Sequence, residues 1–493
     1  MSKQTLMQSY IAGIRDTSVG EKYTTILTYF VPEFITALLL SSVLNFLDAW
    51  FIADLQSTSL YATQGISSTL THFITKIAEG VSIGTVILCG QYNGLGKMQN
   101  VGKAAISALW ITCIMGLCVT CALFFGASWI YSFFHMTPKM LQHGVSFLRL
   151  RSLSVFFAFM FFALIGFLRG IKNTRVPMML FIIGGVIFIF FDYALIFGKW
   201  GFPELQLKGS AIASLIQYIV MFCGACCYLI FDKHNRLYSM HIIKSFDVRE
   251  GLNILWFSLP VMADKAILAA AKIWLGHLIS PMGKMVTASF TVIKDIEQLA
   301  FIPAIAFAQV ITFLVSNDYA RHNWAGIKAN IKKVIFLSSL IVFTVLLIFS
   351  LFPATLVQLF DKKGTFIVFA SMAIPYVSVL VFFDLLQLIL AGALRGAANV
   401  KMVMLIRLIV CVGFFVPTSY LCSSLPISQP ILKFILVYGS FYVSNGLMSI
   451  MYIYRFRSNA WKQYSQIPVK DNHEQNYQGR NTKTRPHISD QGT

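Results

Sequence analysis

Apolar residues are gathered into twelve long runs along the chain, and polar segments separate one run from the next. A helix needs about 20 apolar residues to cross the roughly 30 Å hydrocarbon core of a bilayer, and it satisfies its own backbone hydrogen bonds there. The pattern therefore predicts an all-α, polytopic membrane protein with six spans on each side of a longer polar segment. We expect these spans at residues 26–53, 65–90, 104–125, 147–168, 176–197, 209–231, 252–280, 285–316, 331–352, 366–394, 402–422 and 431–454.

Composition supports the same class, because 57% of the 493 residues are hydrophobic and only 12% are charged. Soluble globular domains carry about 25% charged residues, so a soluble enzyme is excluded. The polar segments divide the chain into two lobes with flanking regions. We expect an N-terminal segment at 1–25, a first lobe at 26–231, an inter-lobe loop at 232–250, a second lobe at 251–455 and a disordered tail at 456–493.

Lys and Arg are distributed unevenly between alternate loops. The two ends of the chain and every second loop between them hold 25 Lys and Arg, whereas the other loops hold six. Positive residues accumulate on the cytoplasmic side of membrane proteins. We therefore expect a multi-pass protein of the cell's inner (plasma) membrane with both termini in the cytoplasm. Topology explains the net charge of +19, and no nucleic-acid partner is expected.

The two halves resemble copies of each other. Residues 164–181 align with 390–407 at an offset of 226 residues, and 7 of these 18 positions are identical. Pro32 in the first span corresponds to Pro260 in the seventh. Because each half has an even number of spans, the repeat is parallel, with its axis along the membrane normal. This predicts two six-helix lobes related by a pseudo-twofold axis, which can rock about a central site.

Eight acidic residues fall within the predicted spans, where an unpaired charge costs about 2.5–3.5 kcal/mol at the bilayer centre. Two of them have a lysine three residues away, so the pairs Lys76–Glu79 and Lys294–Glu297 are each expected to neutralise themselves on one helix face. The eight residues are Glu33, Asp48, Glu79, Asp192, Asp264, Asp295, Glu297 and Asp384.

The remaining acids differ in their local surroundings. Asp264 has Lys265 beside it and Lys272 two turns further along, so a structural ion pair and a transport role are both open. Glu33 lies near the start of its span, where interfacial water is expected to solvate it.

Asp48, Asp192 and Asp384 have no cation within four residues of the sequence. Asp384 is in the middle of its expected span, whereas solvation at a membrane interface stays open for Asp192 and Asp48. Apolar surroundings disfavour a charged carboxylate, so such a group binds a proton, a sodium ion or an organic cation. A single site that holds either an ion or a substrate gives exchange without further machinery. These three residues are therefore candidates for ion coupling.

Motifs for other chemistry are absent from the sequence. There is no Gly-rich phosphate loop ending in Gly-Lys-Ser/Thr, so direct ATP drive is not expected. Neither H-E-x-x-H nor G-x-S-x-G occurs, so no protease or lipase signature is present. We expect neither an enzyme nor a resident metal or cofactor.

Four stretches together carry the pattern of a known family. Residues 45–53 are similar to a first-span signature N-x-x-D-x-x-F-x-G, and 84–94 to the end of the second span. Residues 167–177 are similar to the loop between spans four and five, and 383–396 to the tenth span. On these stretches the chain resembles the multidrug and toxic compound extrusion (MATE) transporters of the MOP flippase superfamily, and the NorM-type branch most closely.

The resemblance implies a cation-coupled antiporter whose two six-helix lobes form a V. In the first lobe it implies ion coupling at Asp48 and Asp192, with the hydroxyl of Ser214 contributing. In the second lobe it implies sodium binding at Asp384. A transient Na⁺ at Asp384 or Asp48 is thus the only metal that the resemblance suggests.

Two residues of the family pattern are replaced. The position one turn before Asp192, often Asn in members of the family with this cluster, is Phe188 here. The family's NorM-type branch has a Glu about eight residues after the seventh-span proline, and Leu268 occupies that position here. Glu297 or Asp295 could substitute for it, with Asp264 nearby, or Lys272 could take the place of the ion.

Our leading hypothesis is a monomeric secondary antiporter in the lipid bilayer. It would export small, amphipathic and cationic organic compounds in exchange for H⁺ or Na⁺. Asp48, Asp384, Lys272 and Glu79 are the candidate substrate-binding residues. One alternative is a flippase for lipid-linked saccharides, in which Lys76, Lys265, Lys272 and Lys294 would bind pyrophosphate. A polytopic membrane enzyme is a further alternative.

Overall fold

The computed structural model describes residues 14, 18–133, 138–240, 246–358 and 367–463. Helices make up most of these residues, and no strand occurs among them, which confirms the expected all-α class. The long helices are α4 (Thr58–Gly94), α5 (Met98–Phe133), α6 (Pro138–Gly170), α7 (Arg175–Phe197), α8 (Leu207–Phe231), α9 (Val248–Ile279), α10 (Lys284–Ala320), α11 (Trp324–Leu351), α13 (Ile367–Gly396) and α16 (Pro430–Arg457).

Two further spans are interrupted by a π-helical turn. The first is α2 (Tyr23–Leu38), η1 (Leu39–Val43) and α3 (Leu44–Asp54); the second is α14 (Val400–Val410), η4 (Cys411–Phe415) and α15 (Val416–Ser424). Short helices fill several connections, at η2 (Lys233–Tyr238), η3 (Ser280–Met282), α12 (Pro353–Gln358) and η5 (Ala460–Gln463).

Each of the twelve predicted spans has a helical counterpart. Eleven helical segments among the described residues are long and apolar enough to cross a membrane, and the interrupted first span, from Tyr23 to Asp54, supplies the twelfth. Many helices are longer than predicted: α5 continues to Phe133 and α6 begins at Pro138. The apolar pattern marks only the stretch that matches the bilayer core, whereas a helix can continue into its polar interface.

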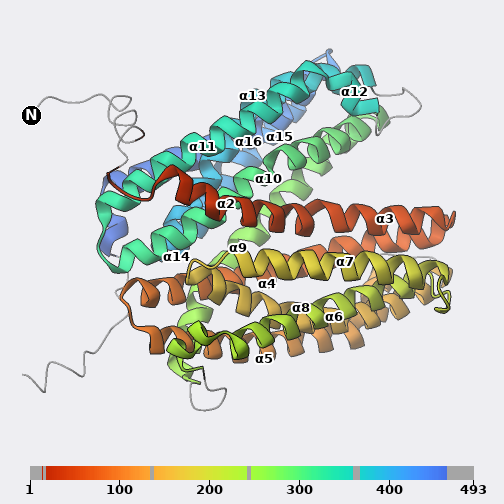
Figure 1. Cartoon of the computed structure of the whole chain (residues 1–493). Helices are drawn as coiled ribbons and strands as arrows, with labels where there is room; N and C mark the ends of the chain where they lie inside the picture. Colours follow the sequence, from red (N-terminus) through yellow and green to blue (C-terminus); the bar gives the residue numbers. More distant parts are fainter. Residues whose placement is uncertain (1–13, 15–17, 134–137, 241–245, 359–366, 464–493) are drawn as a thin grey trace, which may run out of the picture.

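The helices form two groups that touch at one end and diverge towards the other (Figure 1). One group contains α3–α8, and the other contains α10–α16. We call these the N-lobe and the C-lobe. Their divergence gives the V shape that the family resemblance implied.

Two spans pass from one lobe to the other, and they are equivalent in the repeat. The first half of α2 packs in the C-lobe, where Phe30 stacks on Phe307 with ring centroids 4.1 Å apart. Conversely, the first half of α9 packs against α4 and α5, and Tyr92 donates a hydrogen bond to Glu250 at 2.6 Å. Each of these helices contains a proline, Pro32 or Pro260. The lobes are therefore tied together by a reciprocal exchange of half-helices.

The repeat is also visible in the turns at the joined end. Lys172 and Ala398, which are equivalent at the offset of 226, both have left-handed backbones with φ of 63° and 59°. In each turn the following Asn donates its N–H five residues back, Asn173 to Leu168 and Asn399 to Leu394, both at 2.9 Å. The same local structure recurs although the residues at 172 and 398 differ.

Close packing at the joined end depends on a glycine of α4. A Cβ on Gly94 would lie 2.2 Å from the carbonyl oxygen of Asn317 on α10, which no side chain could accept. Beside it, the Asn93 amide donates to the Asn317 side-chain oxygen at 2.7 Å, and Arg321 Nε donates to the Gly94 carbonyl at 2.6 Å. These contacts hold the two lobes together at this end.

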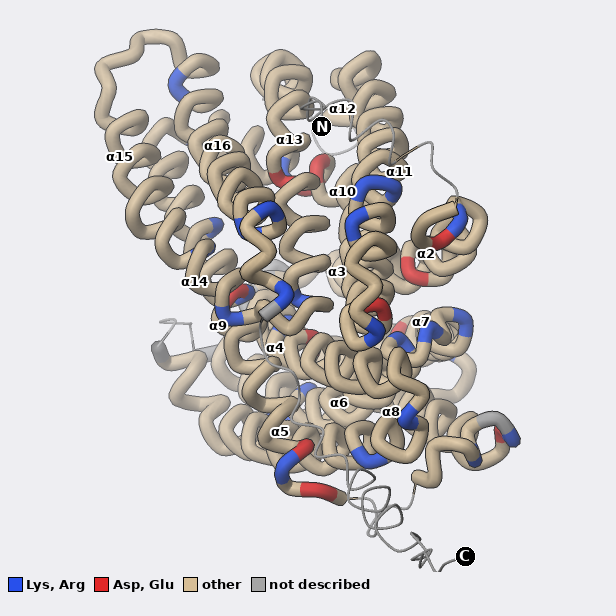
Figure 2. Tube along the Cα trace, turned by 90° about the vertical axis from the view of Figure 1, so that its left-hand side faces the viewer, with Lys and Arg blue, Asp and Glu red and all other residues tan. Residues whose placement is uncertain are grey.

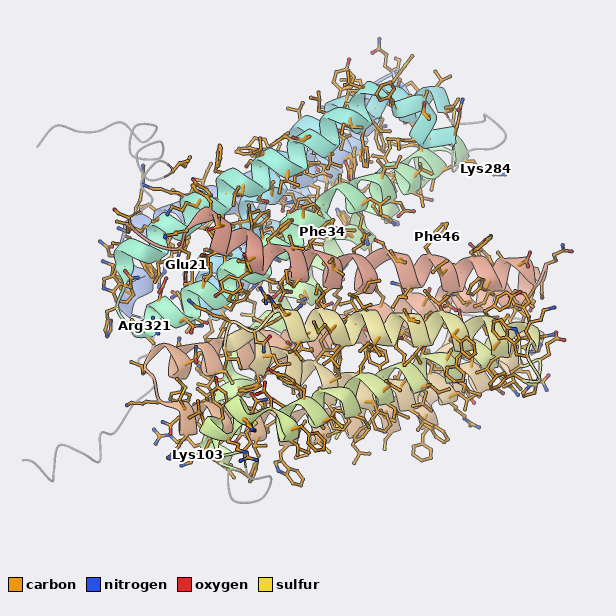
Figure 3. All side chains as sticks on the ribbon, in the orientation of Figure 1. Glu21, Phe34, Phe46, Lys103, Lys284 and Arg321 are labelled. Carbon is orange, nitrogen blue, oxygen red and sulfur yellow. The ribbon has the colours of Figure 1, made fainter. Side chains whose placement is uncertain are left out.

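The basic loops lie at the joined end and not at the open one. Figure 3 shows Glu21, Lys103 and Arg321 at the joined end and Lys284 at the opposite end. Part of the expected tail is folded there: Ala460–Gln463 forms η5, and Trp461 is fully buried against Tyr319 and Phe456. Trp461 supplies apolar surface for this packing although the composition of 456–493 is polar on average. The rest of the expected tail, 464–493, lies outside the described residues.

Candidate functional site

Several acidic and basic residues within the helices pair with residues of other helices. Figure 2 shows acidic and basic positions adjoining at α9 and α14, with further charged positions on other helices. Among the described residues, no three His, Cys, Asp or Glu side chains are grouped as a metal site would require. The arrangement of individual carboxylates and their partners therefore defines the candidate site.

Asp48 is held on the inner side of the N-lobe by two donors from other helices. Its carboxylate accepts a hydrogen bond from Gln64 Nε2 of α4 at 2.8 Å and from the Ser210 hydroxyl of α8 at 2.6 Å. The side chain is buried, and no ion pair of Asp48 is found in the described part of the chain. The carboxylate is thus anchored by two neutral donors.

Asp192 lies close enough to Asp48 for their charges to interact. It is fully buried, and neither of its carboxylate oxygens has a hydrogen-bond partner in the described structure. The buried hydroxyl of Ser214 and Nη1 of Arg151 also lack partners, and the Arg151 charge interacts with Asp192. Unsatisfied buried polar groups are costly, so the Asp192 carboxylate has unused capacity to bind a proton or a cation.

Asp384 has one hydrogen-bond donor in the C-lobe. Asn445 Nδ2 of α16 donates to its carboxylate at 3.0 Å, and the residue is half-buried. The nearest charges that act on Asp384 are Lys272 of α9 and Arg407 of α14. As the sequence predicted, no cation lies within four residues of Asp384 on α13, but α9 and α14 bring two within electrostatic range.

Glu297 has different partners from the one expected. The hydroxyls of Tyr438 and Tyr442 on α16 both donate to Oε2 of Glu297, the second at 2.7 Å. The expected pairing of Glu297 with Lys294 is wrong, because Lys294 contacts Asp295 at 3.6 Å instead. Three-residue spacing places two side chains on one helix face, but here Glu297 accepts hydrogen bonds from phenol groups of a neighbouring helix instead.

Asp264 is fully committed to two arginines. Arg395 Nη2 donates to one of its oxygens at 2.6 Å and Arg407 Nε donates to the other. All three side chains are buried. The expectation that Lys265 or Lys272 would neutralise Asp264 is wrong, because side chains at neighbouring positions on a helix point in different directions.

Glu33 and Arg169 form the corresponding ion pair of the N-lobe. Arg169 donates from Nε and Nη2 to the two oxygens of Glu33, at 2.8 and 2.6 Å. Glu33 is 1% exposed, so the expectation that interfacial water solvates it is wrong. Arg169 and Arg395 are equivalent in the repeat, and both brace the span that crosses between the lobes.

Glu79 joins the two lobes. It accepts from Lys76 of its own helix α4 at 2.7 Å, which confirms the predicted pair, and from Lys265 of α9 at 2.6 Å. Lys272, two turns beyond Lys265, is exposed and has no hydrogen bond or ion pair in the described part of the chain.

The donors to the carboxylates were missed by sequence reasoning. Gln64, Ser210, Asn445 and the two tyrosines lie between 16 and 162 residues from the acids that they contact. A polar side chain in the middle of an apolar span is the only local signal that could have identified Gln64 and Asn445.

Comparison with known proteins gives a consistent result. The MatE family model matches residues 34–194 and 260–421 of the chain. A probable multidrug resistance protein NorM of Thermotoga maritima is 26% identical over 359 residues, which is 70% of this chain and 74% of the relative. A probable multidrug resistance protein YoeA of Bacillus subtilis is 22% identical over 440 residues, with coverage of 87% and 93%.

The fold matches solved structures closely. An outward-facing structure of a multidrug resistance MATE family transporter of the MOP superfamily aligns with a TM-score of 0.81 at 18% identity. The alignment covers 89% of this chain and 96% of that one. A crystal structure of MATE in the straight conformation aligns with a TM-score of 0.80 over the same shares.

Proposed function

The chain belongs to the MatE family, and we propose that it is a secondary active antiporter that exports amphipathic, cationic organic compounds in exchange for H⁺ or Na⁺. Family membership makes it a membrane transporter, not an enzyme. The residues that we assign to ion coupling are Asp48 and Asp192, with Ser214 contributing, and Asp384 and Glu297 in the C-lobe.

The observation that carries this proposal is the pair Asp48–Asp192. Two carboxylates close together in a low-dielectric interior cannot both be ionised without a compensating cation. Asp48 has two donors, whereas both oxygens of Asp192 are buried without one among the described residues. The pair therefore takes up a proton or a metal cation when the surroundings close, and it releases the ion when the lobes rearrange.

Several features support an organic substrate between the lobes. Phe46 lies on the side of α3 that faces the C-lobe and is 67% exposed (Figure 3). Such an aromatic ring can hold the apolar part of a ligand and attract a positive charge. The relatives named as multidrug resistance proteins support drug-like compounds, and they do not favour the saccharide flippase alternative.

The charge distribution supports an orientation in the membrane. Basic loops lie at the end where the lobes join (Figure 3), so we propose that this end and both termini face the cytoplasm. The lobes then diverge towards the outside of the plasma membrane. One chain contains all of these elements, so we propose a monomer.

Removal of the N-lobe carboxylates tests the proposal. Purified protein is reconstituted into proteoliposomes, and efflux of an ethidium-type cation is followed under separately imposed proton and sodium gradients. We expect Asp48→Asn and Asp192→Asn to reduce gradient-driven transport at least tenfold, because neither amide can exchange the coupling ion. The gradient that drives the wild type identifies that ion.

Asp54→Asn is the matched control, because Asp54 is an exposed carboxylate at the end of the same span as Asp48. It should transport like the wild type. Wild-type rates in both N-lobe variants would contradict the assignment of these carboxylates. Absence of transport by the wild type under either gradient would contradict the antiport itself.

A further inference from the structure

An excess of positive charge surrounds Glu79 at the junction of the lobes. Lys76 from the N-lobe and Lys265 from α9 both contact its carboxylate, at 2.7 and 2.6 Å. His72, one turn before Lys76, lies within electrostatic range of both lysines, of Glu79 and of Lys272. The ammonium groups of Lys76 and Lys265 thus share the Glu79 carboxylate, and Lys272 of α9 interacts electrostatically with Lys76.

Lys272 is the second lysine that α9 contributes to this region. It follows Lys265 by seven residues, so both lie on one face of α9. It is exposed, and it makes no hydrogen bond or ion pair within the described residues. The charges that act on it come from Asp384, Lys294, Glu297 and Lys76.

The neighbouring acids already have partners within the C-lobe. Asn445 holds Asp384 at 3.0 Å, and Tyr438 and Tyr442 hold Glu297. Lys294 is 3.6 Å from Asp295. The acids are anchored to the C-lobe, whereas the Lys272 side chain is exposed, seven residues before the end of α9 at Ile279.

We propose that Lys272, with the Lys76 ammonium close by, is a subsite for an anionic group of the transported compound. A carboxylate or sulfonate fits it, because an ammonium group is a compact charge with three donors that can turn towards an oxyanion. The attraction is stronger here than at an ordinary surface, since the surrounding helices lower the effective dielectric. This subsite refines the proposed function: favoured substrates are zwitterionic amphiphiles, with the anionic group at Lys272 and the cationic group at an acid.

A matched pair of dyes tests the subsite without any transport. Tetramethylrhodamine with a free carboxylate and its methyl ester share one cationic ring system and differ in a single charge. Binding to purified protein in a neutral detergent is measured by fluorescence polarisation. We expect the wild type to bind the carboxylate dye at least fivefold more tightly than the ester, and Lys272→Gln to remove this preference by weakening only the carboxylate dye.

Two variants control for folding and for general charge. Lys272→Arg should retain the preference, because the positive charge is kept. Lys284→Gln removes an exposed lysine at the open end of α10 (Figure 3), and it should leave both affinities unchanged. Thermal unfolding of each variant shows whether Lys272→Gln is folded; if it is not, the comparison is made with Lys272→Met.

Three results would overturn the subsite. The wild type would bind both dyes equally, the preference would persist in a folded variant without Lys272, or phosphatidylglycerol would co-purify with the wild type and block the carboxylate dye. The last result would assign Lys272 to a lipid headgroup. A wild type that discriminates between the dyes but exports neither under any gradient would refute the antiport and leave the subsite standing.

Discussion

Both lobes carry carboxylates within their helices, but the two lobes satisfy them in different ways. In the N-lobe, Asp48 has two hydrogen-bond donors and Asp192 has none among the described residues, where neither acid forms an ion pair and the Arg151 charge acts on Asp192. In the C-lobe, Asp384 and Glu297 both accept hydrogen bonds, and Lys272 lies within electrostatic range of each. The two halves therefore share a frame, by which we mean the repeated helices, turns and arginine ion pairs, but differ in the partners of their carboxylates. As a result, the carboxylate oxygens that are free to bind a cation are concentrated in the N-lobe.

The frame itself is preserved in the ion pairs that brace the crossing spans. Arg169 holds Glu33, one residue after Pro32, and Arg395 holds Asp264, four residues after Pro260. The acid has moved by about one helical turn, and Arg407 has joined the C-lobe pair. The position of the arginine is thus more constrained than that of its partner, because the arginine begins the repeated turn.

The largest expected effect comes from breaking these braces. Removing one partner of a buried ion pair costs about 3–5 kcal/mol, because the other charge stays buried and unpaired. We expect Glu33→Gln to lower the free energy of unfolding by about that much, and Asp264→Asn to lower it more, because two arginines lose their partner. Yield of folded protein after detergent extraction and the thermal unfolding midpoint measure both.

Glu21→Gln provides the control for a partly exposed pair. Glu21 lies 2.9 Å from Lys172, with side chains 29% and 21% exposed, and such pairs contribute about 0–1 kcal/mol. Equal losses in all three variants, or a smaller loss for Asp264→Asn than for Glu33→Gln, would show that the second arginine does not depend on Asp264.

The frame could be predicted from the sequence because its signals are local. Apolar runs identify spans, and the motif around Arg169 and Arg395 predicts equal turns, which the equal backbones at Lys172 and Ala398 confirm. Repetition constrains both copies at once, so a weak pattern becomes informative. The crossing of α2 and α9 between the lobes has no such local signal, since it depends on which helices pack together.

The site was less predictable, since most partners come from distant segments. Spacing of three residues identified Lys76–Glu79 correctly but not Lys294–Glu297, where tyrosines from α16 intervene. Asp48 was found through its family motif, whereas Ser210, 162 residues away, became its partner only in three dimensions. Local spacing predicts which side chains share a helix face, but not which partners the neighbouring helix brings to that face.

Removal of single hydroxyls should reveal a smaller difference in stability between the two lobes. Ser210→Ala takes one of two donors from Asp48, which is 8% exposed, so water cannot easily replace it. Tyr438→Phe takes one of two donors from Glu297, which is only half-buried. We expect a loss of about 1.5–3 kcal/mol for the first and about 1 kcal/mol for the second, measured by thermal unfolding.

Ser214→Ala is the control on the same helix as Ser210. The Ser214 hydroxyl is buried and has no hydrogen-bond partner within the described structure, so its removal should not destabilise the protein. Equal losses of unfolding free energy in Ser210→Ala and Tyr438→Phe would mean that solvent reaches both carboxylates alike. The two lobes would then differ only in the presence of Lys272 near the C-lobe acids.

The smallest effect is expected at the contact between the lobes. Glu79 forms one ion pair within the N-lobe, with Lys76, and one across the lobes, with Lys265. Lys76 is 35% exposed and Lys265 is 20% exposed, so the Lys265 pair is less screened by water.

Double-mutant cycles with glutamine at both positions isolate each pair from the general cost of lost charge. We expect a coupling free energy of about 0.5–1 kcal/mol for Glu79–Lys265 and less for Glu79–Lys76. The reverse order would show that Glu79 serves mainly the N-lobe and that its pair with Lys265 adds little to the other contacts between the lobes.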